Sequence, residues 1–297
     1  LNELGLKSPS SLKLSGTLGV SDFTTLRNIQ SLEHLDISRV NLSVLPTEAF
    51  LECTNIKSVI LPNTLTAIGT QAFWGSSLVS ISIPASVEEI RGSAFFGCSS
   101  LKTVTFEKGS KLKTVAGFSH CTSLTTIEIP ASVETIGQYA FNDCTSLHTV
   151  TFEKGSKLKT IGSDVFLNCT SLTMIEIPAS VETIEDQAFE GCSLLATVTF
   201  EKGSQLKTVD GFSNCTALTT VDMSACTQVT RIEYRAFYED SKLQLFKIGT
   251  RTPPSCGRNV FTGINSYSVL KVPAGCVDAY KNATGWKEFT TISELDE

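Results

Sequence analysis

The sequence predicts one continuous solenoid: a right-handed superhelix, mostly β, with a parallel sheet on its concave side and short helical caps at both ends. Three observations predict this fold. A phenylalanine recurs every 22 to 25 residues through most of the 297-residue chain. A cysteine follows most of these phenylalanines by three residues. Apolar residues then recur at fixed spacings, as in Cys121, Leu124, Ile127 and Ile129.

The recurring phenylalanine marks about ten rungs. Its members are Phe50, Phe73, Phe95, Phe118, Phe141, Phe166, Phe189, Phe212, Phe237 and Phe261. The apolar spacing that follows is the L-x-x-L-x-L pattern of a leucine-rich repeat, at a period typical of such repeats. Each rung supplies one short strand with apolar side chains inward, as in residues 126–129. Strands stacked about 4.8 Å apart give a rod roughly 50 Å long.

The two ends depart from the repeat and are expected to cap it. Residues 1–46 form the N-terminal cap and first rung, residues 47–248 the repeat array, and residues 249–297 the last rung and C-terminal cap. Such atypical units cover the hydrophobic layer that the last regular rung would otherwise expose.

Each cap combines a strand with a short helix. Leu12–Leu14 is expected to be a strand, and Ser21-Asp22 to cap a helix that buries Phe23, Leu26 and Ile29.

At the other end, Val277–Ala283 is expected to be helical, and Trp286 and Phe289 to close the stack.

Two kinds of rung alternate. One leaves its strand through Ile-Pro-Ala-Ser-Val-Glu and the other through Phe-Glu-Lys-Gly-Ser. Proline ends the first kind of strand because it cannot donate a hydrogen bond to the ladder. Aligning the two kinds places one charged column along the rod: Glu88, Lys113, Glu134, Lys159, Glu182 and Lys207. The alternation favours a solvated, self-neutralising face over an anion-binding edge, with each exposed pair contributing about 0–1 kcal/mol.

Seven of the 10 cysteines form a second column, and all seven are expected to be buried, reduced thiols. They are Cys53, Cys98, Cys121, Cys144, Cys169, Cys192 and Cys215. Parallel Cβ vectors one strand spacing apart are too distant for a disulfide, and no C-x₂₋₄-C pairs suggest zinc. The column is interrupted near Ser76 and at Asp240. A bridge between Cys256 and Cys276 stays open as an alternative.

The segments N-C-T-S-L-T, I-P-A-S-V-E-T-I and Ala-Phe-x-x-Cys resemble BspA-type leucine-rich repeats. The tail resembles the terminal unit of such proteins from gut and oral Bacteroidetes, with Thr252-Pro-Pro, Val272-Pro-Ala-Gly and Gly285-Trp-Lys. The resemblance covers nearly the whole chain. It implies a non-enzymatic adhesion module, secreted or at the cell surface, that binds a host or extracellular-matrix protein. The first residue is Leu1, as expected for an exported protein without its leader or for a trimmed chain.

Other functions find little support. The net charge of −6 argues against nucleic acid as a partner, and no apolar run is long enough for a transmembrane segment. No cofactor-binding or metal-binding motif occurs, so neither a cofactor nor a metal is expected. His34, His120 and His148 stand in no recognisable catalytic order and are expected to be surface or packing residues. The chain is therefore not expected to be an enzyme.

A ligand is expected on the outward strand positions of the concave sheet. The candidate residues are Thr103, Thr105, Thr126, Glu128, Thr149, Thr151, Met174, Glu176, Thr197, Thr199, Thr220 and Asp222. Threonine also simply suits an exposed strand. However, Glu128, Glu176 and Asp222 are expected to be exposed roughly 10 Å apart. The twelve positions include no aromatic residue, which favours a protein ligand over the alternatives, a glycan ligand or a structural spacer.

Overall fold

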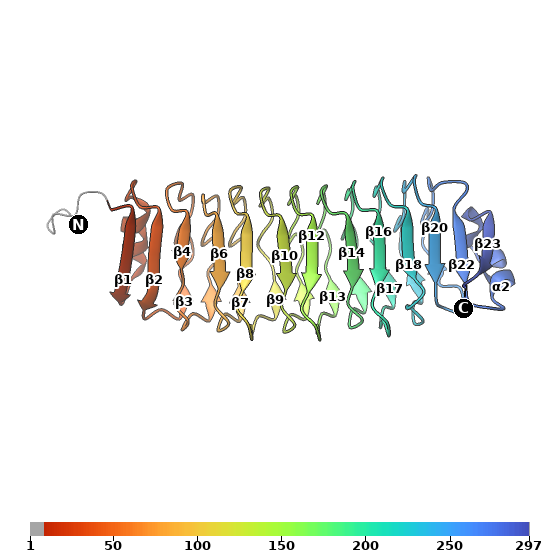
Figure 1. The fold of residues 1–297 in the computed structure, drawn as a ribbon, viewed down its shortest axis with the longest axis horizontal. Coiled ribbons are helices and arrows are strands. Elements are labelled where there is room, and N and C mark those ends of the chain that lie inside the picture. The colour runs from red at the N-terminus through yellow and green to blue at the C-terminus, as the bar shows by residue number, and fades with distance from the viewer. Residues whose placement is uncertain (1–8, 297) are drawn as a thin grey trace.

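The computed structural model describes residues 9–296 and is a rod of about 12 turns (Figure 1). The rod has more turns than the ten rungs counted from phenylalanine, because strands of both caps join the stack. Most of the regular structure is strand, and the helices are short and lie in the caps. No helix among residues 9–296 is long and apolar enough to cross a membrane.

The front sheet runs along the rod and is divided into two parts, of seven and six parallel strands. The first part contains β1 (Ser11–Gly16), β2 (His34–Val40), β4 (Ser58–Ile60), β6 (Ser80–Ile83), β8 (Thr103–Phe106), β10 (Thr126–Ile129) and β12 (Thr149–Phe152). The second part contains β14 (Met174–Ile177), β16 (Thr197–Phe200), β18 (Thr220–Met223), β20 (Leu245–Ile248), β22 (Val269–Val272) and β23 (Thr291–Glu294). Equivalent residues of successive turns face each other, as Thr126 faces Thr149.

The side sheet is one unbroken ladder of 10 two-residue strands, all parallel. They are β3 (Val44–Leu45), β5 (Ala67–Ile68), β7 (Glu89–Ile90), β9 (Thr114–Val115), β11 (Thr135–Ile136), β13 (Thr160–Ile161), β15 (Thr183–Ile184), β17 (Thr208–Val209), β19 (Arg231–Ile232) and β21 (Ser255–Cys256). The rod therefore stays continuous at β12 and β14, where the front sheet is divided.

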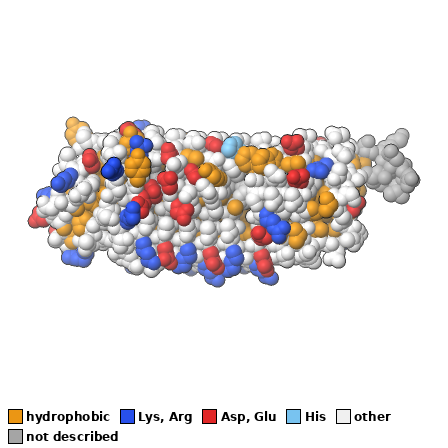
Figure 2. All heavy atoms as spheres, turned by 180° about the vertical axis from the view of Figure 1, so that it is seen from behind, with side chains coloured by type: hydrophobic (Ala, Val, Ile, Leu, Met, Phe, Trp, Pro, Cys, Tyr) orange, Lys and Arg blue, Asp and Glu red, His pale blue; other side chains and the backbone are white. Residues whose placement is uncertain are grey.

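The predicted charge column runs beside the side sheet, where Figure 2 shows basic and acidic side chains alternating along one edge. Lys113 pairs with Glu134 at 2.7 Å, and Glu182 lies between Lys159 at 2.9 Å and Lys207 at 2.6 Å. Hydrogen bonds from Lys207 and Lys159 lower the pKa of Glu182 to about 2. Self-neutralisation is thus confirmed at these three pairs.

The ten recurrent phenylalanines form one buried stack through the rod. Neighbouring ring centroids lie 4.7 to 5.7 Å apart with nearly parallel planes. These distances are close to the strand spacing, so each ring packs on the equivalent ring of the next turn. Phe23 extends the stack at the N-terminal end, with its ring edge-on to Phe50 at 5.6 Å. The predicted core column is confirmed.

The cysteine column forms a ladder of weak hydrogen bonds. The thiol of Cys121 donates to the carbonyl of Phe95 at 3.2 Å, and each following column cysteine does the same to the phenylalanine of the preceding turn. Burial raises the pKa of Cys144 and Cys192 to about 12, which keeps both thiols protonated. Cys256 and Cys276 also carry free thiols in the structure.

The N-terminal cap differs slightly from the prediction. Helix α1 (Val20–Arg27) begins before the predicted Ser21-Asp22 cap, because Gly19 occupies the N-cap position. Asp22 accepts a hydrogen bond from the Gly19 amide at 2.8 Å, so it stabilises the helix start from inside the first turn. Phe23 is buried as predicted, whereas Ile29 is only half-buried.

The C-terminal cap contains α2 (Val277–Asn282) and a 3₁₀ turn, η2 (Trp286–Glu288). Trp286 is fully buried, its ring centroid lies 5.2 Å from that of Phe261, and its indole N–H donates to the carbonyl of Pro254 at 3.0 Å. The ring of Phe289 also packs on Phe261, with their centroids 4.8 Å apart. Trp286 and Phe289 close the phenylalanine stack, as predicted.

The turn side of each rung is the segment that joins a side strand to the next front strand. Positive φ angles recur there, two residues before and two residues after the stacked phenylalanine. The non-glycine residues concerned are Glu48, Glu52, Gln71, Ser93, His120, Tyr139, Asp143, Asp164, Asn168, Gln187, Asn214, Arg235, Glu239 and Asn259. This left-handed conformation costs an L-residue about 1–2 kcal/mol, so the stacking of turns maintains strained backbone along the whole rod.

Two turn-side segments are shorter than the others by two residues. Residues 115–118 and 209–212 reach the stacked phenylalanine directly, whereas residues 136–141 take the usual longer route. Gly117 and Gly211 supply the positive φ in the short segments, at 89° and 84°. A Cβ on Gly211 would overlap the Ala188 amide nitrogen and lie 2.7 Å from a backbone oxygen. Glycine is therefore required there for conformation and for space.

Candidate functional site

The front face consists of the outward side chains of the front sheet. A hollow of about 320 Å³ lies on this face over β8, β10 and β12. It brings together six of the twelve predicted residues, which are Thr103, Thr105, Thr126, Glu128, Thr149 and Thr151. Strand alternation places them outward, since the residues between them, Val104, Ile127 and Val150, are buried.

The other six predicted residues lie beyond the division of the front sheet, on β14, β16 and β18. Met174 is 59% exposed and Glu176 is also exposed. The remaining four are half-buried, namely Thr197, Thr199, Thr220 and Asp222. The structure therefore separates the predicted set into an open group on β8 to β14 and a more covered group on β16 and β18.

Asp222 corrects the expectation of an exposed acid. It is half-buried, with its carboxylate 2.8 Å from Lys247 Nζ and 2.6 Å from the Ser224 hydroxyl. Burial opposes its ionisation, but hydrogen bonds from Lys247 and Ser224 outweigh this effect and lower its pKa. Lys247 occupies the position equivalent to Asp222 in the next turn, so the repeat spacing places the two side chains next to each other.

Glu153 borders the hollow and was not among the predicted residues. Its carboxylate accepts a hydrogen bond from the Ala131 amide at 2.8 Å, just after β10 ends. Glu107 and Glu201 do the same toward Ala85 and Ala179. The glutamate of each Glu-Lys-Gly-Ser turn thus fixes the preceding Pro-Ala-Ser turn. The regular alternation of the two kinds of turn in the sequence could have predicted this contact.

Two notches on the turn side were not predicted. Each forms where a short segment leaves a space between two longer neighbours. The first notch, of about 320 Å³, surrounds Ala116 and Ser119. The second, of about 160 Å³, surrounds Asp210 and Ser213. The sequence indicated these notches only through the length of segments 115–118 and 209–212, which are two residues shorter than their counterparts in the other rungs.

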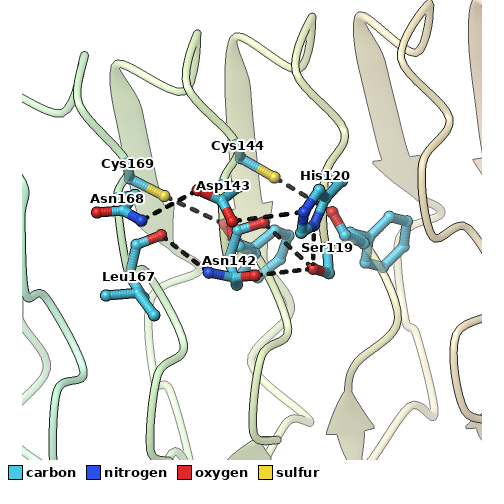
Figure 3. A network of polar contacts seen from close by, with 10 residues as sticks. Ser119, His120, Asn142, Asp143, Cys144, Leu167, Asn168 and Cys169 are labelled. Carbon is cyan, nitrogen blue, oxygen red and sulfur yellow. Dashed lines mark hydrogen bonds and ion pairs between the residues drawn. The ribbon is translucent and has the colours of Figure 1, made fainter.

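The first notch contains a closed polar network (Figure 3). The Ser119 hydroxyl lies 2.9 Å from His120 Nδ1 and 3.1 Å from Asn142 Oδ1. His120 Nε2 lies 3.5 Å from an Asp143 carboxylate oxygen, and Asn168 donates to the other oxygen at 3.1 Å. In the folded rod His120 therefore lies beside both a serine hydroxyl and a carboxylate. Asp143 comes from the next turn, 23 residues along the chain, which conceals the contact in the sequence.

His120 also ends an aromatic stack on the turn side. Its ring lies 4.9 Å from that of Phe96, which in turn lies 4.1 Å from Trp74. The residue types around His120 are those of serine hydrolases, but Ser119 is only 6% exposed and its hydroxyl is held by Asn142. The geometry is therefore that of a packed polar cluster.

Comparison with known proteins identifies the repeat. The family described as "BspA type Leucine rich repeat region" matches in six copies, over residues 23–117, 114–244 and 207–291. A leucine-rich repeat protein of Bacteroides ovatus has a solved structure 22% identical in sequence, with a TM-score of 0.56. The match covers 95% of this chain and 84% of that one.

The pneumococcal vaccine antigen PcpA is 18% identical over 90% of this chain and 80% of its own, with a TM-score of 0.47. The likeness to the Bacteroides ovatus protein shows the fold alone. No curated protein was found to match the chain.

Proposed function

The chain belongs to the BspA-type leucine-rich repeat family, and from this premise we propose that it is a non-enzymatic adhesion module that binds a protein ligand through its front face. Proteins of this family are typically binding modules associated with the cell surface. We propose a host or extracellular-matrix protein as the ligand and the cell surface or the extracellular space as the location.

The hollow over β8 to β12 is the observation that carries this proposal. Glu128 is exposed, and its carboxylate makes no hydrogen bond or ion pair within residues 9–296. The threonines around it present hydroxyl groups on a rigid parallel ladder, and β-branched side chains lose little rotamer freedom on binding. Such a surface offers hydrogen bonds and a negative charge to a protein ligand at little entropic cost.

Nothing in the predicted set suits the stacking of a sugar ring, because none of the twelve residues is aromatic. Met174 adds an exposed apolar side chain two turns from Glu128, and methionine adapts to irregular protein surfaces. A protein ligand therefore suits the front face better than a glycan does.

Surface plasmon resonance against immobilised matrix proteins, beside a glycan array, tests this proposal. We expect binding to at least one matrix protein, weakened at least tenfold by Glu128→Lys combined with Glu176→Lys. Glu52→Lys combined with Glu288→Lys makes the same charge change away from the front sheet and should preserve affinity. Binding only to glycans, or equal affinity of the two double variants, would contradict the proposal.

A further inference from the structure

The two notches have corresponding backbones and different polar linings. Ala116 in the first notch corresponds to Asp210 in the second, and Ser119 corresponds to Ser213. The Ser119 hydroxyl is hydrogen-bonded, whereas the Ser213 hydroxyl has no partner in the described chain, although Ser213 is only 7% exposed. The second notch therefore contains a nearly buried polar group that the protein itself does not satisfy.

Asp210 repeats this pattern with a charged group. It is 8% exposed and borders the second notch. One carboxylate oxygen accepts the Gly211 amide at 2.7 Å, and the other has no hydrogen-bond partner among residues 9–296. A buried carboxylate is stable only when a cation or several donors face it. The unpartnered oxygen is not fully enclosed by the described residues, so it can accept a hydrogen bond from a donor outside the chain.

The surroundings of Asp210 are acidic. Asp186 and Glu190 border the same notch, and Glu233 adds to the negative potential. Figure 2 shows acidic side chains gathered over the C-terminal half of this side of the rod. Arg235 also borders the notch, but its guanidinium lies over the Tyr238 ring and forms no ion pair in the described structure. The notch therefore presents several carboxyl groups that are not ion-paired with the one cation at its rim.

Two tyrosines flank the opening. The Arg235 guanidinium lies 4.6 Å from the ring centroid of Tyr238 and 5.0 Å from that of Tyr234. Tyr234 is 52% exposed, which is high for a large side chain. Tyrosine and arginine are among the residue types most enriched at binding hot spots. Arg235 also keeps its N–H donors available for a carbonyl of a bound chain.

We propose that the second notch binds a lysine or arginine side chain of a protein partner, at a position separate from the front face. The ammonium or guanidinium group would donate to Asp210 and Ser213, with Asp186 and Glu190 providing longer-range attraction. The aliphatic part of the same side chain would pack along the Tyr234 ring. A metal ion is less suitable, because no group of three or more metal-binding side chains converges within residues 9–296.

The ionisation of Asp210 provides a second readout of the same site. Burial raises the pKa of Asp210 to about 7, opposed by the Gly211 amide and assisted by Asp186, Glu233 and Glu190. A bound cation favours the ionised carboxylate and lowers this pKa. Part of the Asp210 population is protonated at pH 7, so binding of the basic side chain should release a proton to the solvent.

Calorimetric titration with the peptide Gly-Gly-Lys-Gly-Gly and its arginine and glutamine analogues tests the proposal. We expect the two basic peptides to bind and the glutamine peptide to bind at least tenfold more weakly. Repeating the titration at pH 7 in buffers of different ionisation enthalpy should reveal a fraction of a proton released per peptide. Failure of both basic peptides to bind at millimolar concentration would overturn the proposal.

Matched variants distinguish binding in the second notch from binding elsewhere on the rod. Asp210→Asn should weaken binding at least tenfold and abolish proton release, and a thermal melt will show that it remains folded. Ser119→Ala, a change confined to the first notch, should leave both readouts unchanged, as should the double front-face variant. Equal binding by Asp210→Asn would refute the assignment. If methylammonium displaced the lysine peptide at the same concentration as the peptide itself binds, the ligand of the notch would be a free amine and not a protein side chain.

Discussion

The first and second notches arise from the same two-residue shortening, yet one is chemically closed and the other is open. In the first, Ser119, His120 and Asn142 hydrogen-bond to one another. In the second, Asp210 replaces a methyl group and leaves one oxygen without a partner in the described residues. The comparison shows that segment length determines the shape of a notch, while single side chains decide whether it can accept a ligand.

The largest expected effect concerns the glycine that makes each notch. Gly211→Ala adds a Cβ that overlaps backbone atoms at positive φ, so we expect a loss of about 3–5 kcal/mol of stability. At Gly117 the added Cβ would lie 3.0 Å from the Ala94 amide nitrogen, so Gly117→Ala should cost less. Urea denaturation followed by circular dichroism measures both losses.

Gly155→Ala is the matched control for conformation alone. Gly155 has a φ of 80° and nothing within 4 Å of an added Cβ. Its substitution should cost about 1–2 kcal/mol, the conformational penalty without the steric one. Equal losses at Gly155 and Gly211 would show that the second notch is not sterically constrained.

The next effect distinguishes the notches by pH. The raised pKa of Asp210, about 7, means that the folded state binds a proton more tightly than the unfolded state does. Stability from this group is therefore fully present below the unfolded pKa and is lost as pH rises through about 7. We expect Asp210→Asn to be more stable than the natural chain by about 1–3 kcal/mol at pH 8, and thermal melts at pH 5 and pH 8 measure the difference.

Other carboxyl groups do not obscure this window. Glu182 and Asp36 have pKa values lowered to about 2, so their contributions change only in stronger acid. Burial also raises the pKa of Asp240. Asp240 is present in both the natural protein and Asp210→Asn, so its contribution cancels in the difference between their stabilities. A variant whose stability falls with pH as steeply as that of the natural chain would show that Asp210 is not the titrating group.

The smallest effect compares the two serines. Ser119→Ala removes the hydrogen bond to Asn142 and should cost about 1 kcal/mol. Ser213→Ala removes a hydroxyl without a partner in the described chain and should change stability by less than about 0.5 kcal/mol. Thermal unfolding of both variants measures the two losses of stability. A larger loss for Ser213→Ala would mean that the second notch is closed after all.

The sequence predicted the solenoid well because its strongest signals belong to the core. Phe118 and Cys121 recur with their counterparts at fixed spacing, and each has one packing position in the stack. The front face was predicted only in part. Strand alternation placed Glu128 outward, but the half-buried pairing of Asp222 with Lys247 depends on how closely adjacent turns pack.

The notches were missed because their contacts join different turns. His120 and Asp143 meet only once their turns are stacked, and both lie at positive φ. Part of that backbone pattern was readable, since glycine and asparagine recur two residues after the phenylalanine, as at Gly97 and Asn168. The other strained column carries no such signal, because Gln71 and its equivalents are ordinary residues held there by stacking.

The two tryptophans of the chain allow the unfolding of each end of the rod to be followed by fluorescence. Trp74 stacks on Phe96 near the N-terminal end, while Trp286 is enclosed in the C-terminal cap. Each rung rests only on its neighbours, so unfolding can begin at either end of such an array. Replacing one tryptophan by phenylalanine leaves the other as the sole tryptophan, and the red shift of its emission then reports the opening of its own end. The chain thus carries two tryptophan probes, one for each direction in which the stack can unfold.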